Sequence, residues 1–428
     1  MTLNAAQPQP DRLPLQDDAT QRPPLVVFAA ARWQFDWQRP QQLLTRLAKH
    51  YRVYYVEKPH TTHEDPWLEC GEVAPGVERL VAHTRCDARG FHDEQLPIVG
   101  GLLAQFMRER GVAGPLVWLD TPAPLPLAEA LQPRGIVYDC HDVATALSDG
   151  LDDDRLRHRE ARLMRLADIV VAGGPSLYQS LRGRHANVHC IANAVAAAHF
   201  APPPVAGNSI EAVSARAIHA AIPNPRLGFF GVIDERVDLD LVARMADLRP
   251  DWHFVMAGPL RGVAPEALPR RGNLTWLGAQ TYAILPHLQA HWDVCVLPFK
   301  VDVCAQRAAP IELLEYLAGQ KSVVSTPVHD VVALHGHIVR TGHDANALVE
   351  ACRAAMCERG PLRRQRRIDA LIAVHSCTWD RAADRVHKLL VEFAHESASA
   401  SVAAGAPSRL FAGAVRAGSN RRSSYGAI

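Results

Sequence analysis

The chain of 428 residues carries 46 Lys and Arg against 45 Asp and Glu, and 48% of its residues are hydrophobic. At roughly 100 to 200 residues per domain, this length predicts two domains. The formal net charge of +1 disfavours a general nucleic-acid-binding role, which needs excess positive charge. Nine cysteines without a CxxC pair favour reduced thiols and a cytoplasmic location over a zinc site. The sequence shows neither the charged-then-apolar order of a secretory signal nor a run of roughly 18 apolar residues. We therefore expect a soluble α/β enzyme or binding protein.

Short apolar runs alternate with helical patterns through the first half of the chain. The expected strands are residues 25–30, 52–56, 115–119, 135–139, 168–172 and 188–192, and the expected helices are 40–50, 125–131, 152–166 and 176–181. Helix 152–166 is expected to bury Leu156, Leu163 and Leu166. Repeated strand, crossover and strand units indicate a parallel sheet with helices on both faces. We therefore assign residues 23–200 to one Rossmann-like domain.

The same alternation resumes after an Ala- and Pro-rich segment, residues 201–225, which predicts a linker. The second half has expected strands at residues 227–230, 253–257, 274–277, 294–297 and 322–325, and expected helices at 239–248, 282–290, 310–318, 345–358, 362–375 and 379–394. Residues 226–395 thus predict a second Rossmann-like, doubly wound domain that ends in closing helices. The composition of residues 1–22 and 396–428 is typical of disordered tails.

The segment after residue 297 contains the strongest candidate for a binding residue. Ligands of open parallel sheets bind beyond the carboxyl ends of the strands, so two such domains predict a cleft between two sets of loops. Glu315 falls in the first two turns of a helix beginning at Pro310. A carboxylate there can accept two ribose hydroxyl hydrogens, while the amides opening the helix face a diphosphate. A solvated surface glutamate is the alternative, and helical periodicity alone favours it.

Motifs in a fixed order carry a family resemblance. The second half has Gly231 in a glycine turn with Arg236 behind it, then EYLA at residues 315–318 and VVST at 323–326. The first half has WQRPQQLLTRLA at residues 37–48 and YDCHD at 138–142. Together these motifs resemble those of the retaining nucleotide-sugar glycosyltransferases of GT-B architecture. Within the family-four group of these enzymes they resemble the group 1 branch, and the resemblance covers about residues 25–392. The resemblance implies transfer of a glycosyl unit from a nucleotide-diphosphate sugar with retention, independent of metal and of any further cofactor.

The resemblance also assigns donor-side roles. Glu315 would accept the ribose hydroxyls, and Arg236, beside the Gly231 turn, would pair with the donor diphosphate. The alternative for Arg236 is a surface ion pair with Asp234 or Asp238.

The acceptor side falls to the first domain. His141, followed by Asp142, would hydrogen-bond the transferred sugar, although a lone histidine after a strand is as readily structural. Asp120 could contact or deprotonate the acceptor, and its alternative role is a helix cap. Arg39 and Gln41 would line the loop where acceptor and diphosphate meet, or else belong to the start of the next helix.

Departures from the family pattern concern the donor site. Glu312 stands where the branch has lysine, a reversal of charge beside the expected diphosphate. The wider family's first glutamate is Arg307 here, and this arginine could restore the lost cationic contact. Gln320 replaces a glycine in the turn before the next strand. We therefore expect a working but atypical donor site.

Two further functions stay open. One is a nucleotide-sugar epimerase or hydrolase of the same fold, and the other, suggested by Glu312 and Gln320, is a catalytically silent binding or scaffold protein. The acidic run at residues 152–154 favours a helix-dipole role over a metal site. The resemblance implies cell-surface polysaccharide or glycolipid synthesis and a sugar or lipid-linked acceptor, while the balanced charge predicts no nucleic-acid partner. Peripheral contact with the inner face of the membrane through scattered arginines is an added hypothesis.

Overall fold

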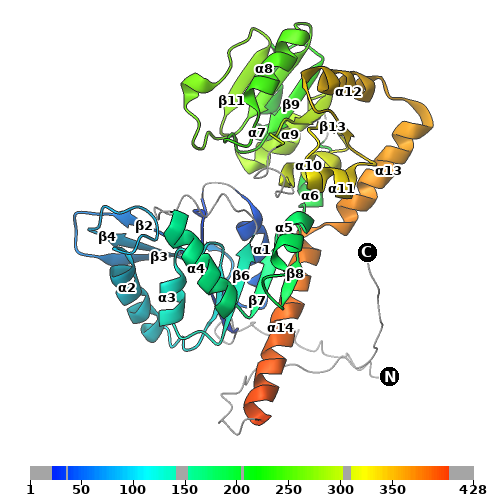
Figure 1. Cartoon of the computed structure of the whole chain (residues 1–428). Helices are drawn as coiled ribbons and strands as arrows, with labels where there is room; N and C mark the ends of the chain where they lie inside the picture. The colour runs from blue at the N-terminus through cyan, green and yellow to red at the C-terminus, as the bar shows by residue number, and fades with distance from the viewer. Residues whose placement is uncertain (1–21, 35–36, 141–152, 204–206, 302–309, 404–428) are drawn as a thin grey trace, which may run out of the picture.

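The computed structural model describes residues 22–34, 37–140, 153–203, 207–301 and 310–403, which form two α/β domains (Figure 1). Each domain is built on a mainly parallel sheet with helices on both faces, and this architecture confirms the predicted fold class of two Rossmann-like, doubly wound domains. The expected tails at residues 1–21 and 404–428 lie outside the described residues.

The first domain contains an eight-stranded sheet in the order β3-β4-β2-β1-β5-β6-β7-β8. All neighbouring strands are parallel except β3 and β4, which form an antiparallel hairpin at one edge that was not expected. The strands are β1 (Pro24–Phe28), β2 (Arg52–Thr61), β3 (Trp67–Ala74), β4 (Val77–Thr84), β5 (Leu116–Leu119), β6 (Gly135–Cys140), β7 (Ile169–Ala172) and β8 (Val188–Cys190). The crossovers run in opposite directions from β1, so the crevice for a ligand is expected beyond β1 and β5.

The two faces of this sheet have separate cores. Because side chains alternate along a strand, Val26 and Phe28 of β1 face one core, and Leu25 and Val27 face the other. The first core is covered by α2 (Leu96–Glu109), α3 (Leu125–Ala130), α4 (Asp153–Leu166) and α5 (Pro175–Leu181), and the second by α1 (Arg39–Leu47) and α14 (Trp379–Ala403). Within α4, Leu166 is 39% exposed, so its expected burial was wrong.

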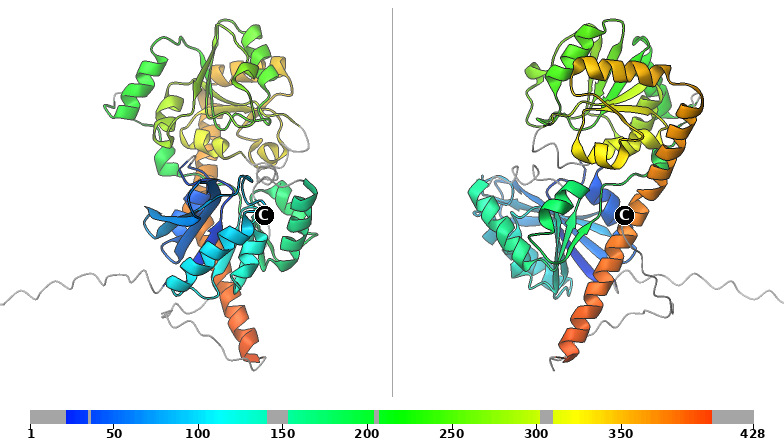
Figure 2. Two further views of the ribbon diagram at one scale, coloured as in Figure 1. Left: turned by 90° about the vertical axis from the view of Figure 1, so that its left-hand side faces the viewer. Right: turned by 45° about the vertical axis from the view of Figure 1, so that its right-hand side comes forward.

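The last helix, α14, returns to the first domain. Its buried residues, Trp379, Val386 and Leu390 among them, share a core with β1 and α1. Figure 2 shows α13 and α14 running along one side of the molecule from the second domain to the first. The sequence grouped α14 with the second domain, because an apolar helical stripe shows which face is buried but not against which sheet.

The second domain contains a six-stranded parallel sheet in the order β11-β10-β9-β12-β13-β14. Its strands are β9 (Arg226–Phe230), β10 (His253–Ala257), β11 (Leu274–Gly278), β12 (Val294–Leu297), β13 (Ser322–Ser325) and β14 (Arg340–Thr341). The helices are α8 (Leu239–Leu248), the 3₁₀ turns η3 (Pro265–Ala267) and η4 (Tyr282–Ile284), α9 (Leu285–Ala290), α10 (Ile311–Ala318), α11 (His329–His335), α12 (Ala345–Cys357) and α13 (Gly360–Ser376). The order reverses between β9 and β12, which predicts a ligand crevice beyond these two strands.

Between the last strand of the first sheet and the first strand of the second, the chain contains α6 (Ala197–Phe200) and α7 (Ile210–His219). Among the described residues, no helix combines the length and the apolar character needed to cross a bilayer.

Candidate functional site

The loop after β9 is fixed on both sides by its neighbours. The Gly231 N–H donates to the Ala257 carbonyl at 3.1 Å, and the Asp238 N–H donates to the Pro298 carbonyl at 2.8 Å. Gly231 has φ +150°, and a Cβ there would stand 2.6 Å from Glu312 Oε1. A Cβ on Gly258 would stand 1.7 Å from the Gly231 carbonyl oxygen. Both positions require glycine, and the close approach brings this turn directly against the start of α10.

Helix α10 is anchored to β9 by Tyr316. Its hydroxyl donates to the Phe230 carbonyl at 3.0 Å and accepts from the Phe230 N–H at 2.8 Å. Glu312 and Glu315 are three residues apart and therefore lie on one side of the helix. The geometry thus places two carboxyl groups beside the glycine turn, beyond the carboxyl ends of β9 and β12.

These two carboxyl groups lie in an unusual electrostatic setting. Burial raises the pKa of Glu315 well above its ordinary value, and the like charge of Glu312 raises it further. Burial also raises the pKa of Glu312, against the opposing effects of its own backbone N–H and of Arg236. Within the part of the chain that the structure describes, the Glu315 carboxyl has no ion pair, although its residue is only 5% exposed. Such a group is a candidate for ligand binding.

Arg236 stands in the loop after β9 and is held by Asp234. The guanidinium makes bonds of 3.0 Å from Nε and 2.7 Å from Nη2 to that carboxylate. The ion pair with Asp234 that was the alternative interpretation therefore exists, while Asp238 caps α8 through Leu241 N–H. The guanidinium of Arg236 also lowers the pKa of Glu312, against the effect of burial. A diphosphate contact by Arg236 stays a prediction.

Arg39 and Gln41, both on α1, are buried in the first domain. Arg39, 3% exposed, makes a two-pronged ion pair with Asp139 of β6, at 2.9 and 3.0 Å, and donates to the Ile191 carbonyl at 2.8 Å. Gln41 donates to the Trp33 carbonyl at 3.0 Å and accepts from the Gln38 N–H at 3.1 Å. These contacts favour the structural alternative for both residues, and a ligand contact by either remains a prediction.

Asp120 follows β5 directly, at the predicted crevice of the first domain. It accepts from the Trp118 indole N–H at 3.0 Å, and its own N–H donates to the Phe28 carbonyl at 3.2 Å. It does not cap the following helix, because the residue before α3 is Pro124. The other predicted site residues, His141, Asp142 and Arg307, lie outside the described residues.

Sequence reasoning missed a contact between the two domains. Gln42 of α1 donates from Nε2 to the Tyr282 hydroxyl at 3.0 Å. Burial raises the pKa of Tyr282, and the carboxylate of Glu315 raises it further. Ile311, at the start of α10, packs against the core of the first domain. The candidate donor residues are thus adjacent to the place where the two domains meet.

A second contact between the domains joins α5 and α11. The Ser176 backbone N–H donates to Asp330 Oδ1 at 3.2 Å, and the Ser176 hydroxyl lies 2.9 Å from His329 Nδ1. Asp330 is almost completely buried by this contact. No local sequence pattern indicates either contact, because the partners belong to distant parts of the chain.

The backbone at Gln320 explains why the family pattern has a glycine in the turn before β13. Its φ of +56° lies in the left-handed region, where a side chain is unfavourable. Its side-chain oxygen accepts a hydrogen bond from Arg367 of α13, which offsets part of that cost. Across the described ranges, no group of three or more His, Cys, Asp or Glu residues is arranged to hold a metal ion.

Comparison with known proteins finds a family similarity in the second domain. Residues 224–358, from the start of the second domain to the end of α12, match the family model described as glycosyl transferases group 1. This part of the chain is similar to that family. The group 1 match covers β9 to β14 and therefore includes Gly231, Arg236 and both glutamates of α10.

One curated relative and several solved structures are similar to the chain. A candidate teichuronic acid biosynthesis glycosyltransferase, TuaH of Bacillus subtilis (strain 168), is 28% identical over 205 residues, 45% of this chain and 50% of that protein. The chain thus spans about half the length of this curated relative.

The solved structures show the fold. Sucrose-phosphate synthase from Thermosynechococcus elongatus has a TM-score of 0.65 at 15% identity, over 88% of this chain and 100% of that chain. Anabaena HepE, in complex with UDP and glucose, has a TM-score of 0.62 at 15% identity, over 87% and 100%. Trehalose-6-phosphate synthase from Burkholderia multivorans has 0.63 at 14% identity, over 91% and 100%. These likenesses confirm the predicted GT-B architecture across both domains.

Proposed function

We propose that this protein is a glycosyltransferase that moves a sugar from a nucleotide-diphosphate sugar to an acceptor, with retention at the anomeric carbon and without a metal ion. The observation that carries the proposal is the placement of Glu312 against the Gly231 turn, with the buried Glu315 on the same side of α10, inside the segment that matches the group 1 glycosyl transferases. HepE, which shares the fold, was solved with UDP and glucose, and this supports a nucleotide-sugar donor.

The proposed donor pose follows from the charges of the second domain. The nucleotide ribose would donate its hydroxyl hydrogens to Glu315, and the diphosphate would lie by the glycine turn, near Arg236. Because the departing diphosphate accumulates negative charge, fixed N–H groups and a guanidinium there stabilise the transition state more than the ground state. In a retaining transfer of this kind, the leaving diphosphate can itself take the acceptor proton.

Donor binding should release a proton in this pose. Without ligand, the raised pKa keeps Glu315 protonated over a wider pH range, whereas ribose hydroxyl donors favour its ionised form. The affinity for the donor is therefore expected to rise with pH and to level off above the pKa of the free protein.

The relative supports a proposal for the acceptor and the pathway. TuaH is named for teichuronic acid biosynthesis, which supports an acceptor that belongs to a cell-surface polysaccharide or glycolipid. Asp120, which directly follows β5 at the predicted crevice of the first domain, would contact the acceptor. Peripheral attachment to the inner face of the membrane is part of this proposal, since a lipid-linked acceptor would reside there.

The decisive experiment measures nucleotide release from a panel of UDP-, GDP- and dTDP-sugars, with and without candidate acceptors. We expect one donor to be consumed mainly when acceptor is present, and the product to keep the donor's anomeric configuration by NMR. Donor turnover without acceptor would instead identify an epimerase or hydrolase. Failure of every nucleotide to bind, in calorimetry as well as in the turnover assay, would leave the scaffold function and contradict the proposal.

A further inference from the structure

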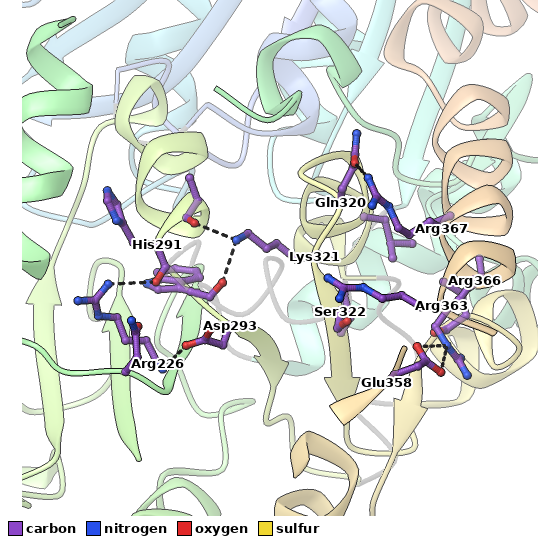
Figure 3. A pocket seen from close by; sticks show the side chains of 17 residues that line it. Arg226, His291, Asp293, Gln320, Lys321, Ser322, Glu358, Arg363, Arg366 and Arg367 are labelled. Carbon is purple, nitrogen blue, oxygen red and sulfur yellow. Dashed lines mark hydrogen bonds and ion pairs between the residues drawn. The ribbon is translucent and has the colours of Figure 1, made fainter. Parts of the chain in front are cut away.

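A basic cavity of about 460 Å³ lies at the amino ends of β9, β12 and β13 (Figure 3). It is therefore on the opposite edge of the second sheet from Glu312 and Glu315. The cationic side chains that line it are Arg226, Lys321, Arg363, Arg366 and Arg367, against the acidic Asp293 and Glu358. This excess of positive charge around a partly enclosed space favours an anionic ligand.

Four of the five cations are held in place by the protein itself. Arg226 donates to three backbone carbonyls, of Ile222, His219 and His291. Arg366 pairs with Glu358, and Arg367 donates to Gln320. These bonds fix the walls of the cavity before any ligand arrives, which lowers the entropy cost of binding.

Lys321 keeps a donor for a ligand. Its ammonium donates to the Ala290 carbonyl at 3.0 Å and the Trp292 carbonyl at 2.8 Å, so two of its three N–H groups are used. Burial lowers the pKa of Lys321, because the charged form loses hydration. An anion in the cavity would return part of that lost stabilisation.

Arg363 projects from α13 into the cavity, and Figure 3 shows its side chain beside Ser322. Within the described ranges, Arg363 has neither an ion pair nor a side-chain hydrogen bond. It also lines an adjoining cavity of about 350 Å³, where Arg359 is a second cation. Arg363 thus lines both cavities, and its guanidinium is available to bind a ligand.

We propose that this cavity binds the phosphate group of a ligand, with Arg363 as the main contact and Lys321 as a second one. A guanidinium matches phosphate oxygens through parallel N–H bonds, and such charge-assisted bonds are stronger than neutral ones. The volume is in the range of small-molecule sites, about 300 to 1,000 Å³. The nucleotide donor is not this ligand, because its proposed site lies a full strand length away, about 13 Å or more at roughly 3.3 Å per residue.

The phosphate can belong to a small metabolite or to a lipid headgroup. Next to the cavity, α13 exposes apolar side chains, with Leu362 73% and Ile372 60% exposed. Exposed apolar residues beside arginines are typical of helices that lie on anionic membranes. A lipid headgroup would therefore involve the exposed apolar side chains of α13 as well as Arg363. A small metabolite would use Arg363 without those apolar side chains.

The test compares two charge reversals on the same helix. Arg363→Glu changes a residue that lines both cavities, whereas Arg364→Glu is a matched control that lines neither. Calorimetry with inorganic phosphate and with glucose 6-phosphate probes the free ligand. Co-sedimentation with phosphatidylglycerol vesicles, against phosphatidylcholine vesicles, probes the headgroup. All measurements are repeated with the Arg236→Ala variant, which lacks the cation of the proposed donor site. Phosphate binding that is lost in this variant is binding to the donor site and not to the cavity.

We expect Arg363→Glu to weaken phosphate or vesicle binding about tenfold or more, and Arg364→Glu and Arg236→Ala to keep wild-type binding. Binding of free phosphate that needs Arg363 supports the site with a soluble ligand. Binding to phosphatidylglycerol vesicles that needs Arg363, without binding of free phosphate, supports it with a headgroup. Equal losses in the two charge-reversed variants, loss in Arg236→Ala alone, or no binding of any probe would overturn the proposal.

Discussion

Two buried charged groups, one in each domain, are held in opposite ways. In the first domain, Arg39 makes a two-pronged ion pair with Asp139 and donates to a backbone carbonyl. In the second domain, Glu315 is equally buried, yet its strongest electrostatic neighbour is the like charge of Glu312. Both groups were predicted to bind a ligand, and only the second has an environment that a ligand would improve.

The difference shows how a buried charge that stabilises the fold can be distinguished from a buried charge that binds a ligand. A paired and hydrogen-bonded charge joins the elements that carry it, here α1 and β6, and removing one partner leaves the other uncompensated. An unpaired carboxyl with a raised pKa costs stability, so its position makes sense where a ligand supplies the missing donors. The comparison yields predictions that can be ordered by the size of their effect.

The largest effect is expected from Arg39→Met. This change leaves Asp139 buried without its counter-ion, and breaking a buried pair in this way costs about 3 to 5 kcal/mol. Denaturant unfolding followed by fluorescence should show a lower free energy of unfolding at an unchanged slope. The double variant Arg39→Met/Asp139→Leu should lose less than the single one. If Arg39→Met were as stable as the wild type, the ion pair would not stabilise the fold, and Arg39 would again be a candidate for the acceptor site.

How far the sequence predicts this molecule depends on whether the relevant contacts are local. Parallel strands such as β12 (Val294–Leu297) are buried on both faces and form continuous apolar runs, so the sheets and their order of appearance were predictable. The edge strand β3 (Trp67–Ala74) is only partly buried and has no such run, so the hairpin was missed.

The candidate site divides in the same way. Glu315 stands on the helix that the sequence placed after Pro310, because cap and periodicity are local signals. The contact between Gln42 and Tyr282 joins residues 240 positions apart, and neither residue has a neighbourhood that indicates the other. The ion pair of Arg39 with Asp139 could likewise be known only once β6 was placed beside α1.

The next effect in size concerns Glu315→Gln and donor binding. The amide cannot accept two hydroxyl hydrogens as a carboxylate does, so the donor affinity should fall about tenfold or more, measured by calorimetry. Glu266→Gln, an exposed change in the same domain, is the matched control and should bind as the wild type does. Unchanged donor affinity in Glu315→Gln would show that the ribose is held elsewhere.

The same variant tests the raised pKa through stability. Because the folded-state pKa of Glu315 lies above 4.5, the folded chain binds this proton more tightly than the unfolded chain. Its stabilising contribution is complete below about pH 4.5 and is lost as the pH rises through the raised pKa. The Glu315→Gln variant cannot ionise at this position. Its free energy of unfolding, relative to that of the wild type, should therefore increase as the pH rises. A constant difference between the two proteins would contradict the raised pKa of the buried Glu315.

A smaller effect is expected from Glu312→Gln, which removes the like charge beside Glu315. The pKa of Glu315 should fall toward its usual value, so the pH above which donor affinity levels off should move down. The diphosphate would also meet less repulsion, and donor affinity should rise about two- to fivefold. Glu312→Asp keeps the charge and serves as the control. A weaker donor affinity in Glu312→Gln would mean that Glu312 itself contacts the donor.

The smallest effect is expected from Tyr282→Phe at the contact between the domains. Removing the hydroxyl deletes the 3.0 Å bond from Gln42, which should cost about 0.5 to 1.5 kcal/mol of unfolding free energy. The aromatic ring stays, so its packing against Trp37, at 6.4 Å between ring centroids, is retained. The double variant Gln42→Leu/Tyr282→Phe should recover part of the loss, since it leaves no buried amide without a partner. Burial raises the pKa of Tyr282, so its hydroxyl stays neutral and carries no charge that acts on Glu315. Tyr282→Phe should therefore keep a donor affinity close to that of the wild type, and a loss as large as that of Glu315→Gln would place Tyr282 in the donor site itself.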